Sequence, residues 1–375
     1  MFALRKIAYF LCIIHWCNAS NIERIDIHID KLRLTNILYG STELAHLRCN
    51  ECLSNNTHEF IEGSLVLNGF GSRFISMPKK NYRFNYNNES IVLVNAIEPG
   101  RISTSLFNTL TEAAGGNAIY QQFIELYINN VYNGLYYTKH MSFAVNYTEV
   151  FKIETDAVPD NSYLLSDLDI NTNMDHSYNI FSYISSLFAV DDMTMHNYAI
   201  LRNGHENDEH NATFGITAWD TDLALGAPTK SPILYNNYLN FIGSIFMINR
   251  LTDQSQSSIK IDTFHNIKSK YNLFNPINAP SNITTYNNKF VDILTNGVLT
   301  IENITIKINN YENYLSDAFK RDEAKWGDYY CLNDNLFSID YLKTVLFNNH
   351  AAILNTLINN TSVYVPTPYQ YCNYM

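Results

Sequence analysis

Three side chains near the middle of the chain have the types and spacing needed to hold a metal ion and orient a hydroxyl group. Asp192 and Asn197 are separated by four residues, and Asp220 follows a mostly apolar stretch. In phosphoryl-transfer enzymes, this D-x-x-x-x-N spacing places the aspartate near the attacking hydroxyl and the asparagine on a metal ion. The spacing alone is weak evidence, because Asp and Asn are common. The alternative is that these residues cap turns, and that Asp220 and Asp222 lie on a solvated loop.

The order of the elements around these residues favours the metal-site interpretation. A helix is expected over residues 178–190, just before Asp192, and two short strands over 198–201 and 214–219. Such a hairpin would return Asp220 to the side of Asn197. A carboxylate at the end of a buried strand is costly without a cation. Mg²⁺ prefers such oxygen ligands and takes further ligands from phosphates.

A group of glycines and cations earlier in the chain is suited to phosphate. Gly69, Gly71 and Arg73 belong to a short glycine turn, and Lys79 and Lys80 open the next expected strand. Glycine lets backbone N–H groups approach phosphate oxygens, and basic side chains balance their charge. On these residues alone, an ordinary hairpin with solvated cations remains open. Adjacent strand residues face opposite sides, so one lysine of the pair should point inward.

Composition excludes some classes of protein. The 375 residues are 46% hydrophobic and 16% charged, which is enough apolar material for one large domain or two ordinary ones. Lys and Arg number 25 against 36 Asp and Glu, a net charge of −11. A fold-wide nucleic-acid binder would be basic, so we expect no nucleic-acid partner. An anionic substrate would require a local basic pocket.

The N-terminal residues predict secretion. Arg5 and Lys6 precede an apolar run that ends at Trp16, and small residues follow to Ala19. This pattern is typical of a signal peptide, residues 1–19, and the run is shorter than the roughly 20 residues of a membrane span. No later stretch is long and apolar enough to span a bilayer. We therefore expect a secreted, extracellular or cell-surface protein with no stable membrane span.

The cysteines and sequons agree with that compartment. Four cysteines follow the expected leader, which favours disulfide bonds, although sequence does not choose their pairing. Cys49 and Cys52 lie between His46 and His58, so a zinc site is the alternative there. Several Asn-x-Ser/Thr sequons are typical of a glycoprotein.

Strand-like and helix-like segments are unevenly distributed. Residues 20–150 are rich in expected strands, and residues 151–375 are mainly helical in pattern. This order predicts an α+β fold with a β-rich N-terminal lobe, a mainly helical C-terminal lobe and a cleft between them.

Several motifs, taken in order, resemble the CotH kinase family, which is named for a bacterial spore coat protein. The matching pieces are residues 67–73 with 78–84, 126–136, 196–201 and 219–226, and more weakly Asp322 with Lys325 and Trp326. The resemblance covers about residues 60–330. It implies a diverged, two-lobed protein-kinase-like fold over residues 20–375. It also implies a secreted kinase that uses ATP and Mg²⁺ or Mn²⁺ to phosphorylate extracellular, spore coat or wall proteins.

The resemblance also implies roles for individual residues. Asp192 corresponds to the catalytic-loop aspartate and Asp220 to the metal-binding one, with Asn197 and Asp222 also retained. Gly69, Gly71, Arg73, Lys79 and Lys80 correspond to the nucleotide-binding group.

One position departs from the family pattern. His140 stands where the family usually has a glutamate, after Gly-Leu-Tyr. The alternative function is therefore a catalytically inactive adhesin or a spore coat or wall protein, whose partner would be a host surface receptor. A third, weaker alternative is metal-dependent hydrolysis of a phosphate ester.

Overall fold

The computed structural model describes eleven segments of the chain. They are residues 22–49, 59–68, 79–87, 89–119, 121–139, 149–153, 177–188, 198–203, 213–218, 280–330 and 338–359. Within these segments no helix is long and apolar enough to cross a bilayer.

Seven strands form a closed barrel in the order β1-β2-β3-β4-β5-β7-β6. Their bounds are β1 (Glu23–His28), β2 (Glu43–Arg48), β3 (Ile61–Leu67), β4 (Tyr82–Tyr86), β5 (Glu89–Asn95), β6 (Gln121–Ile128) and β7 (Val131–Lys139). Neighbouring strands are antiparallel except β1 and β6, which pair in parallel from Glu23↔Ile124 to Ile27↔Ile128 and so close the barrel. Closure leaves the barrel without an open sheet edge.

Alternating apolar residues fill the barrel. Ile25 and Ile27 of β1 point inward with Leu65, Phe84 and Leu126 from other strands, and all five are fully buried. Period-two alternation is what a strand needs to present one face to a core.

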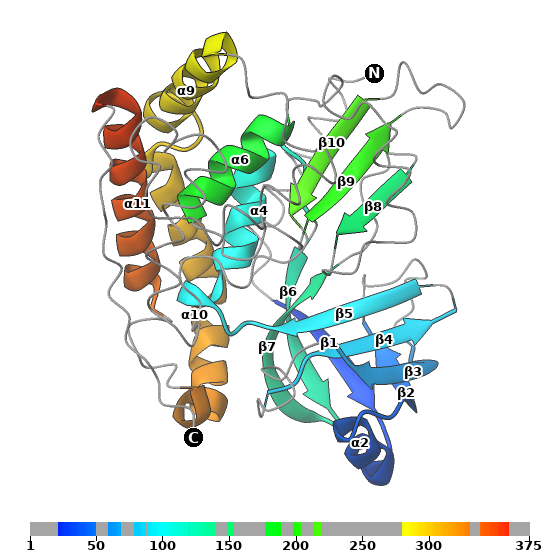
Figure 1. Cartoon of the computed structure of the whole chain (residues 1–375). Helices are drawn as coiled ribbons and strands as arrows, with labels where there is room; N and C mark the ends of the chain where they lie inside the picture. The colour runs from blue at the N-terminus through cyan, green and yellow to red at the C-terminus, as the bar shows by residue number, and fades with distance from the viewer. Residues whose placement is uncertain are drawn as a thin grey trace.

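Helix α2 (Lys31–Leu38) follows β1 and lies at one end of the barrel (Figure 1). Its first turn is capped by Asp30, whose carboxylate accepts hydrogen bonds from the backbone N–H groups of Leu32 and Arg33. Ile37 from α2 is buried in the barrel core.

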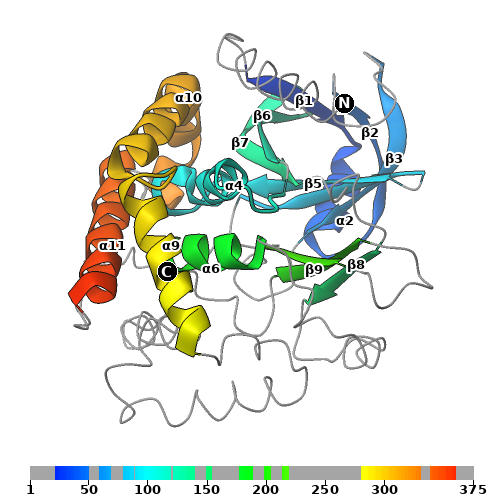
Figure 2. The same cartoon turned by 90° about the horizontal axis from the view of Figure 1, so that it is seen from above.

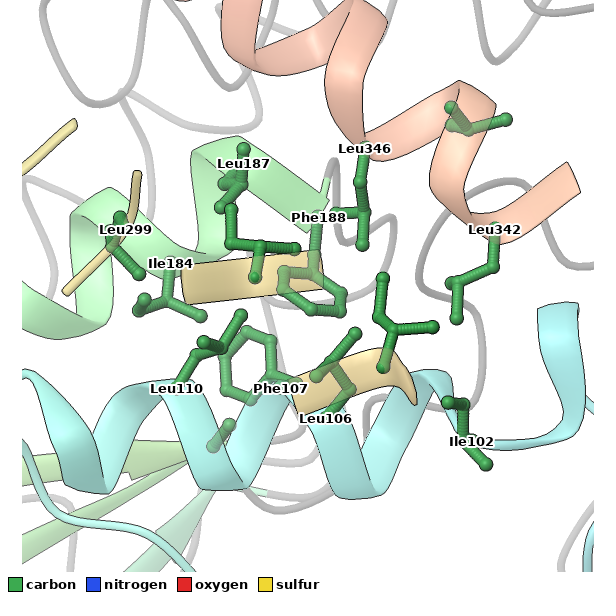
Figure 3. Close-up of a cluster of buried hydrophobic side chains, with 14 of the residues drawn as sticks. Ile102, Leu106, Phe107, Leu110, Ile184, Leu187, Phe188, Leu299, Leu342 and Leu346 are labelled. Atoms are coloured by element: carbon green, nitrogen blue, oxygen red, sulfur yellow. The ribbon is translucent and has the colours of Figure 1, made fainter. Parts of the chain in front are cut away.

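The long helices lie together on one side of the barrel (Figure 2). They are α4 (Ser103–Ala113), α6 (Ser177–Phe188), α9 (Pro280–Thr295), α10 (Ile301–Tyr330) and α11 (Ile339–Asn359). Phe107 of α4 and Phe188 of α6 meet edge to face at 5.4 Å between ring centroids, beside Leu342 and Leu346 of α11 (Figure 3). Such aromatic pairs add to the stabilisation that comes from buried area alone.

A second, smaller sheet contains β8 (Glu149–Ile153), β9 (Tyr198–Asn203) and β10 (Thr213–Ala218) in the order β10-β9-β8. Thr217 of β10 forms a parallel bridge with Asn117, and its hydroxyl donates to the Asn117 carbonyl at 2.9 Å. Helix α6 packs against β10. The small sheet is thereby attached to the loop that follows α4.

The predicted two-lobed, kinase-like fold is wrong. The N-terminal strands form a closed mixed barrel, and Val94, Phe123 and Tyr137 from its wall pack into the same core as the long helices. The barrel and the helices are therefore joined by a continuous apolar core. The cause is the parallel pairing of β1 with β6 across about 100 residues, which local alternation cannot reveal.

Candidate functional site

Two of the predicted metal-binding residues flank the β9–β10 hairpin in the sequence. Tyr198 of β9 is paired with Ala218 of β10. Asn197 directly precedes Tyr198, and Asp220 comes two residues after Ala218. Both strands predicted here are confirmed, and so is the helix before them, which the structure describes as α6 (Ser177–Phe188).

Several predicted site residues lie outside the described residues. They are Asp192, Asn197, Asp220 and Asp222 of the acidic group, Gly69, Gly71 and Arg73 of the glycine turn, and also His140. Their roles stay predictions. Of the predicted site, the structure describes Lys79 and Lys80.

Lys79 is fully buried where the barrel meets α10. Its ammonium Nζ donates to Asp322 Oδ1 at 2.7 Å and to the Leu135 carbonyl at 2.8 Å. It also lies 5.0 Å from the centre of the Tyr136 ring. Burial lowers the pKa of Lys79 to about 8, although Asp322 opposes that shift. This ammonium is held by protein groups and is shielded from solvent. Its predicted contact with nucleotide phosphates stays a prediction.

Asp322 of α10 accepts hydrogen bonds from three directions. Besides Lys79, Arg101 Nη2 donates to Oδ2 at 2.6 Å, and the Leu135 backbone N–H donates to Oδ1 at 2.7 Å. The Asp322 side chain is fully buried. A buried carboxylate is stable only when its charge and lone pairs are satisfied in this way. We call Lys79, Arg101 and Asp322 the buried ion cluster.

The first half of β7 fits closely around this cluster. Gly134 has φ +130°, and an added Cβ would lie 2.5 Å from Asp322 Oδ1 and 2.7 Å from Lys79 Cε. Trp326 Nε1 donates to the Asn133 carbonyl at 2.8 Å. Three separated pieces of the family resemblance, residues 78–84, residues 126–136 and Asp322 with Trp326, therefore meet in one place.

Lys80 is placed differently from its neighbour. It is partly exposed, and burial lowers the pKa of its ammonium. Its backbone carbonyl accepts a hydrogen bond from the Tyr136 hydroxyl at 3.0 Å. The predicted contact of Lys80 with phosphate stays a prediction.

Two cations were missed by the sequence reasoning. Arg101 has a positive φ of 62° after Pro99 and Gly100, and its partner Asp322 lies 221 residues away, so no local pattern reveals the pair. Lys152 lies in β8, paired with Ala199 of β9. The sequence feature that could have drawn attention to Lys152 is its position as a single lysine in the otherwise apolar run from Val150 to Ile153.

The described residues contain no group of three or more histidine, cysteine or acidic side chains placed to hold a metal ion. Cys49 is disulfide-bonded. A thiolate from Cys49 is therefore not available for the alternative zinc site.

A sequence model of the family described as CotH kinase protein matches residues 152–364, which is more than half of the chain. The match begins within β8 and includes α6, β9, β10 and α10. It contains Asp192, Asn197, Asp220 and Asp322, whereas Lys79 and the barrel precede it. Among curated proteins, none is significantly similar in sequence to this chain.

Proposed function

This chain belongs to the CotH kinase protein family, and we propose that it is a protein kinase that transfers the γ-phosphate of ATP to serine, threonine or tyrosine hydroxyls of extracellular or coat proteins. Use of ATP and a divalent metal is a general property implied by the family. The specific reaction and its substrates are our proposal.

The pairing of Tyr198 with Ala218 is the observation that carries the proposal. Paired strand residues lie about 5 Å apart, and each further residue adds at most about 3.8 Å. Chain connectivity therefore limits the Cα atoms of Asn197 and Asp220 to a separation of about 17 Å or less. Their side chains could meet a magnesium–triphosphate cluster from two sides of the same hairpin end.

The donor set suits a magnesium ion. Asp220, Asp222 and Asn197 offer carboxylate and amide oxygens, which Mg²⁺ prefers. When bound, the metal and ATP would supply charge neutralisation and the transferable phosphoryl group. Asp192 would accept the proton of the substrate hydroxyl and orient that hydroxyl toward the phosphorus atom. These roles require positioning, which the β9–β10 hairpin and α6 would provide.

A phosphate-binding cation is also needed. Lys79 is committed to Asp322, so we propose Lys152 for this role. The pairing of Lys152 with Ala199 places its backbone one residue from the Tyr198 end of the hairpin. The glycine turn at Gly69 and Gly71, with Arg73 and Lys80, remains our proposal for a second phosphate contact.

The compartment is part of the proposal. We propose that residues 1–19 direct secretion and that the protein acts in a spore coat, in a wall or on the cell surface. The family is named for a spore coat protein, and the disulfide at Cys49 is typical of an oxidising compartment.

One observation favours the second candidate, a non-catalytic adhesin or coat component. Leu32 and Leu38 on α2 are exposed, and Tyr39 after it is 87% exposed. Exposed apolar side chains close together often mark protein contact sites.

Phosphoryl transfer and nucleotide binding can be tested together. The purified protein is incubated with labelled ATP and Mg²⁺ or Mn²⁺, and co-secreted proteins are examined by mass spectrometry. We expect phosphorylation and an ATP-dependent rise in melting temperature, because a ligand that binds only the folded state stabilises it. A protein that shows neither with either metal is not a kinase, and the adhesin function would then replace it.

A further inference from the structure

The outer face of the barrel carries three arginines that are held by two buried carboxylates. Arg24 and Arg48 bind Asp26, and Arg321 binds Glu125. We call Arg48, Arg24 and Arg321 the arginine stripe. None of these residues belongs to the proposed catalytic group.

Asp26 orients the first two guanidinium groups. Arg24 donates to Asp26 Oδ1 from Nε at 3.0 Å and from Nη2 at 2.6 Å, and Arg48 Nη2 donates to Oδ2 at 2.8 Å. The Asp26 side chain is 3% exposed, whereas Arg24 and Arg48 are 47% and 42% exposed. Burial alone would raise the pKa of Asp26, but the two guanidinium groups outweigh it and lower the pKa. Asp26 therefore stays charged beneath its two partners.

Aromatic rings fix the planes of the same guanidinium groups. The Arg24 guanidinium carbon lies 3.8 Å from the centre of the Tyr127 ring, and that of Arg48 lies 4.8 Å from the centre of the Phe60 ring. Stacking of this kind restricts a long side chain that would otherwise sample many rotamers.

Helix α10 extends the stripe. Arg321 Nε donates to Glu125 Oε1 at 2.7 Å, and the Arg321 side chain is 49% exposed while that of Glu125 is 11% exposed. Glu125 of β6 is paired with Arg24 of β1, and Asp26 of β1 is paired with Arg48 of β2. The three cations therefore lie over adjacent strands β2, β1 and β6 and the neighbouring helix.

The positive charges of the stripe are exposed to solvent, whereas the negative charges that hold them are not. Three cations are half-exposed and two anions lie nearly buried beneath them, on a chain whose net charge is −11. Exposed ion pairs contribute little to stability, so a contribution to folding does not account well for these three arginines. Each guanidinium has five N–H donors, and the bonds to Asp26 and Glu125 use only part of that set.

We propose that the arginine stripe docks an extended, carboxylate-rich segment of a partner protein. Guanidinium groups bind carboxylates in a planar, two-bonded geometry. The strands that carry the stripe span about 10 Å, which is more than one small anion can bridge. Side chains on one face of an extended peptide repeat about every 6.8 Å, so two acidic residues at alternate positions would fit within that span.

Binding of a labelled peptide tests this proposal without any catalytic assay, so its result is independent of the kinase proposal. The probe is a ten-residue peptide with alternating Glu and Ser, and its binding to the purified protein is measured by fluorescence anisotropy. We expect saturable binding that weakens with added salt, and no binding of the peptide with Gln in place of Glu. Equal binding of the two peptides would overturn the proposal.

Variants of the stripe provide the second measurement. Arg48→Gln should weaken binding about tenfold, since it removes a charge-assisted hydrogen-bonding partner. The matched control is Lys320→Gln on α10, which changes the net charge equally at an exposed position outside the stripe and should have little effect. Equal losses in both variants would indicate general attraction and overturn the proposal.

The Asp26→Asn variant distinguishes binding to oriented guanidinium groups from general electrostatic attraction to a positive surface. This change makes the surface more positive, so general attraction predicts tighter binding. Our proposal predicts weaker binding, because the guanidinium groups lose the carboxylate that orients them. Circular dichroism and melting temperature confirm that each variant is folded, and Arg48→Gln provides an independent result if Asp26→Asn does not fold. Tighter binding by a folded Asp26→Asn variant would contradict the proposal.

Discussion

Lys79 and Asp322 lie 243 residues apart in the chain and form a 2.7 Å ion pair in which both side chains are fully buried. The pair joins the segment before β4 to helix α10, and Arg101 joins the turn before α4 to the same carboxylate. A lysine that resembles a nucleotide-binding residue thus lies in a structural contact between the barrel and the helices.

Replacement of Lys79 should affect stability more than nucleotide affinity. Lys79→Met removes one partner of a buried carboxylate, which typically costs about 3–5 kcal/mol, and Arg101 should keep the loss near the lower end. Urea unfolding measures the change. Lys320→Met, at an exposed pair with Asp317, is the control and should change stability by less than about 0.5 kcal/mol. A stable Lys79→Met variant with lost ATP binding would restore the nucleotide role.

Stability should depend on pH through Lys79. Its pKa is about 8 in the folded protein and 10.5 in the unfolded chain. Between those values the unfolded chain binds more protons, so this group makes the free energy of unfolding rise as pH rises from about 8 to 10.5, by up to about 1.4 kcal/mol per pH unit. The measurement is the difference between wild type and Lys79→Met across this window, since other groups titrate in both. Parallel curves would show that the folded-state pKa is not lowered.

Gly134 should be intolerant of any side chain. In Gly134→Ala the new Cβ would approach Asp322, Lys79 and Trp326 within 3 Å, at a φ that L-residues rarely adopt. We expect a loss of more than about 2 kcal/mol in unfolding free energy. Gly115→Ala is the matched control, because it also has a positive φ but has no neighbouring atom within 4 Å. A similar loss in both variants would show that backbone strain, not packing against the cluster, is responsible.

Local patterns predicted most of the individual elements near the site. The alternation of apolar residues predicted β9 and β10, and the apolar periodicity predicted α6. The alternation over residues 22–36 predicts a strand, whereas residues 31–38 form α2, whose first turn Asp30 caps. Caps of this kind depend on backbone geometry that alternation does not reveal.

Long-range pairing could not be predicted in the same way. The parallel contact of β1 with β6 closes the barrel, and the buried ion cluster depends on Asp322 meeting Lys79 and Arg101 from distant parts of the chain. Neither relationship leaves a periodic signal. Resemblance to a family indicated Asp322 and Trp326 but not that they pack against Gly134 of β7.

Lys152 should be required for ATP affinity, in contrast to Lys79. We expect Lys152→Met to raise the KM for ATP about tenfold or more, because a cation beside the phosphates is lost, and Lys152→Arg to retain part of the affinity. Steady-state phosphorylation at varied ATP concentration measures the change. Unchanged KM in a folded Lys152→Met variant would exclude Lys152 from the phosphate site.

Asp220 and Asp192 should have separable roles, and their variants give the sharpest test of the proposed kinase. Asp220→Ala should abolish phosphorylation and also the ATP-dependent rise in melting temperature. ATP brings several negative charges to a site that already contains Asp192 and Asp222, and Asp220 is the residue proposed to hold the metal that offsets them. Without ligand, the variant should be as stable as wild type or slightly more stable, because repulsion between carboxylates is reduced.

Asp192→Asn should retain the ATP- and Mg²⁺-dependent shift and lose about 10²–10⁴-fold in transfer rate, since proton acceptance from the hydroxyl is lost while the metal site remains. Thermal shift and single-turnover phosphorylation, measured on the same samples, distinguish the two effects. Asp317→Ala, an exposed acidic residue on α10, is the matched control and should change neither. If Asp192→Asn loses the ATP-dependent rise in melting temperature as completely as Asp220→Ala, the assignment of hydroxyl orientation to Asp192 and of metal binding to Asp220 is wrong.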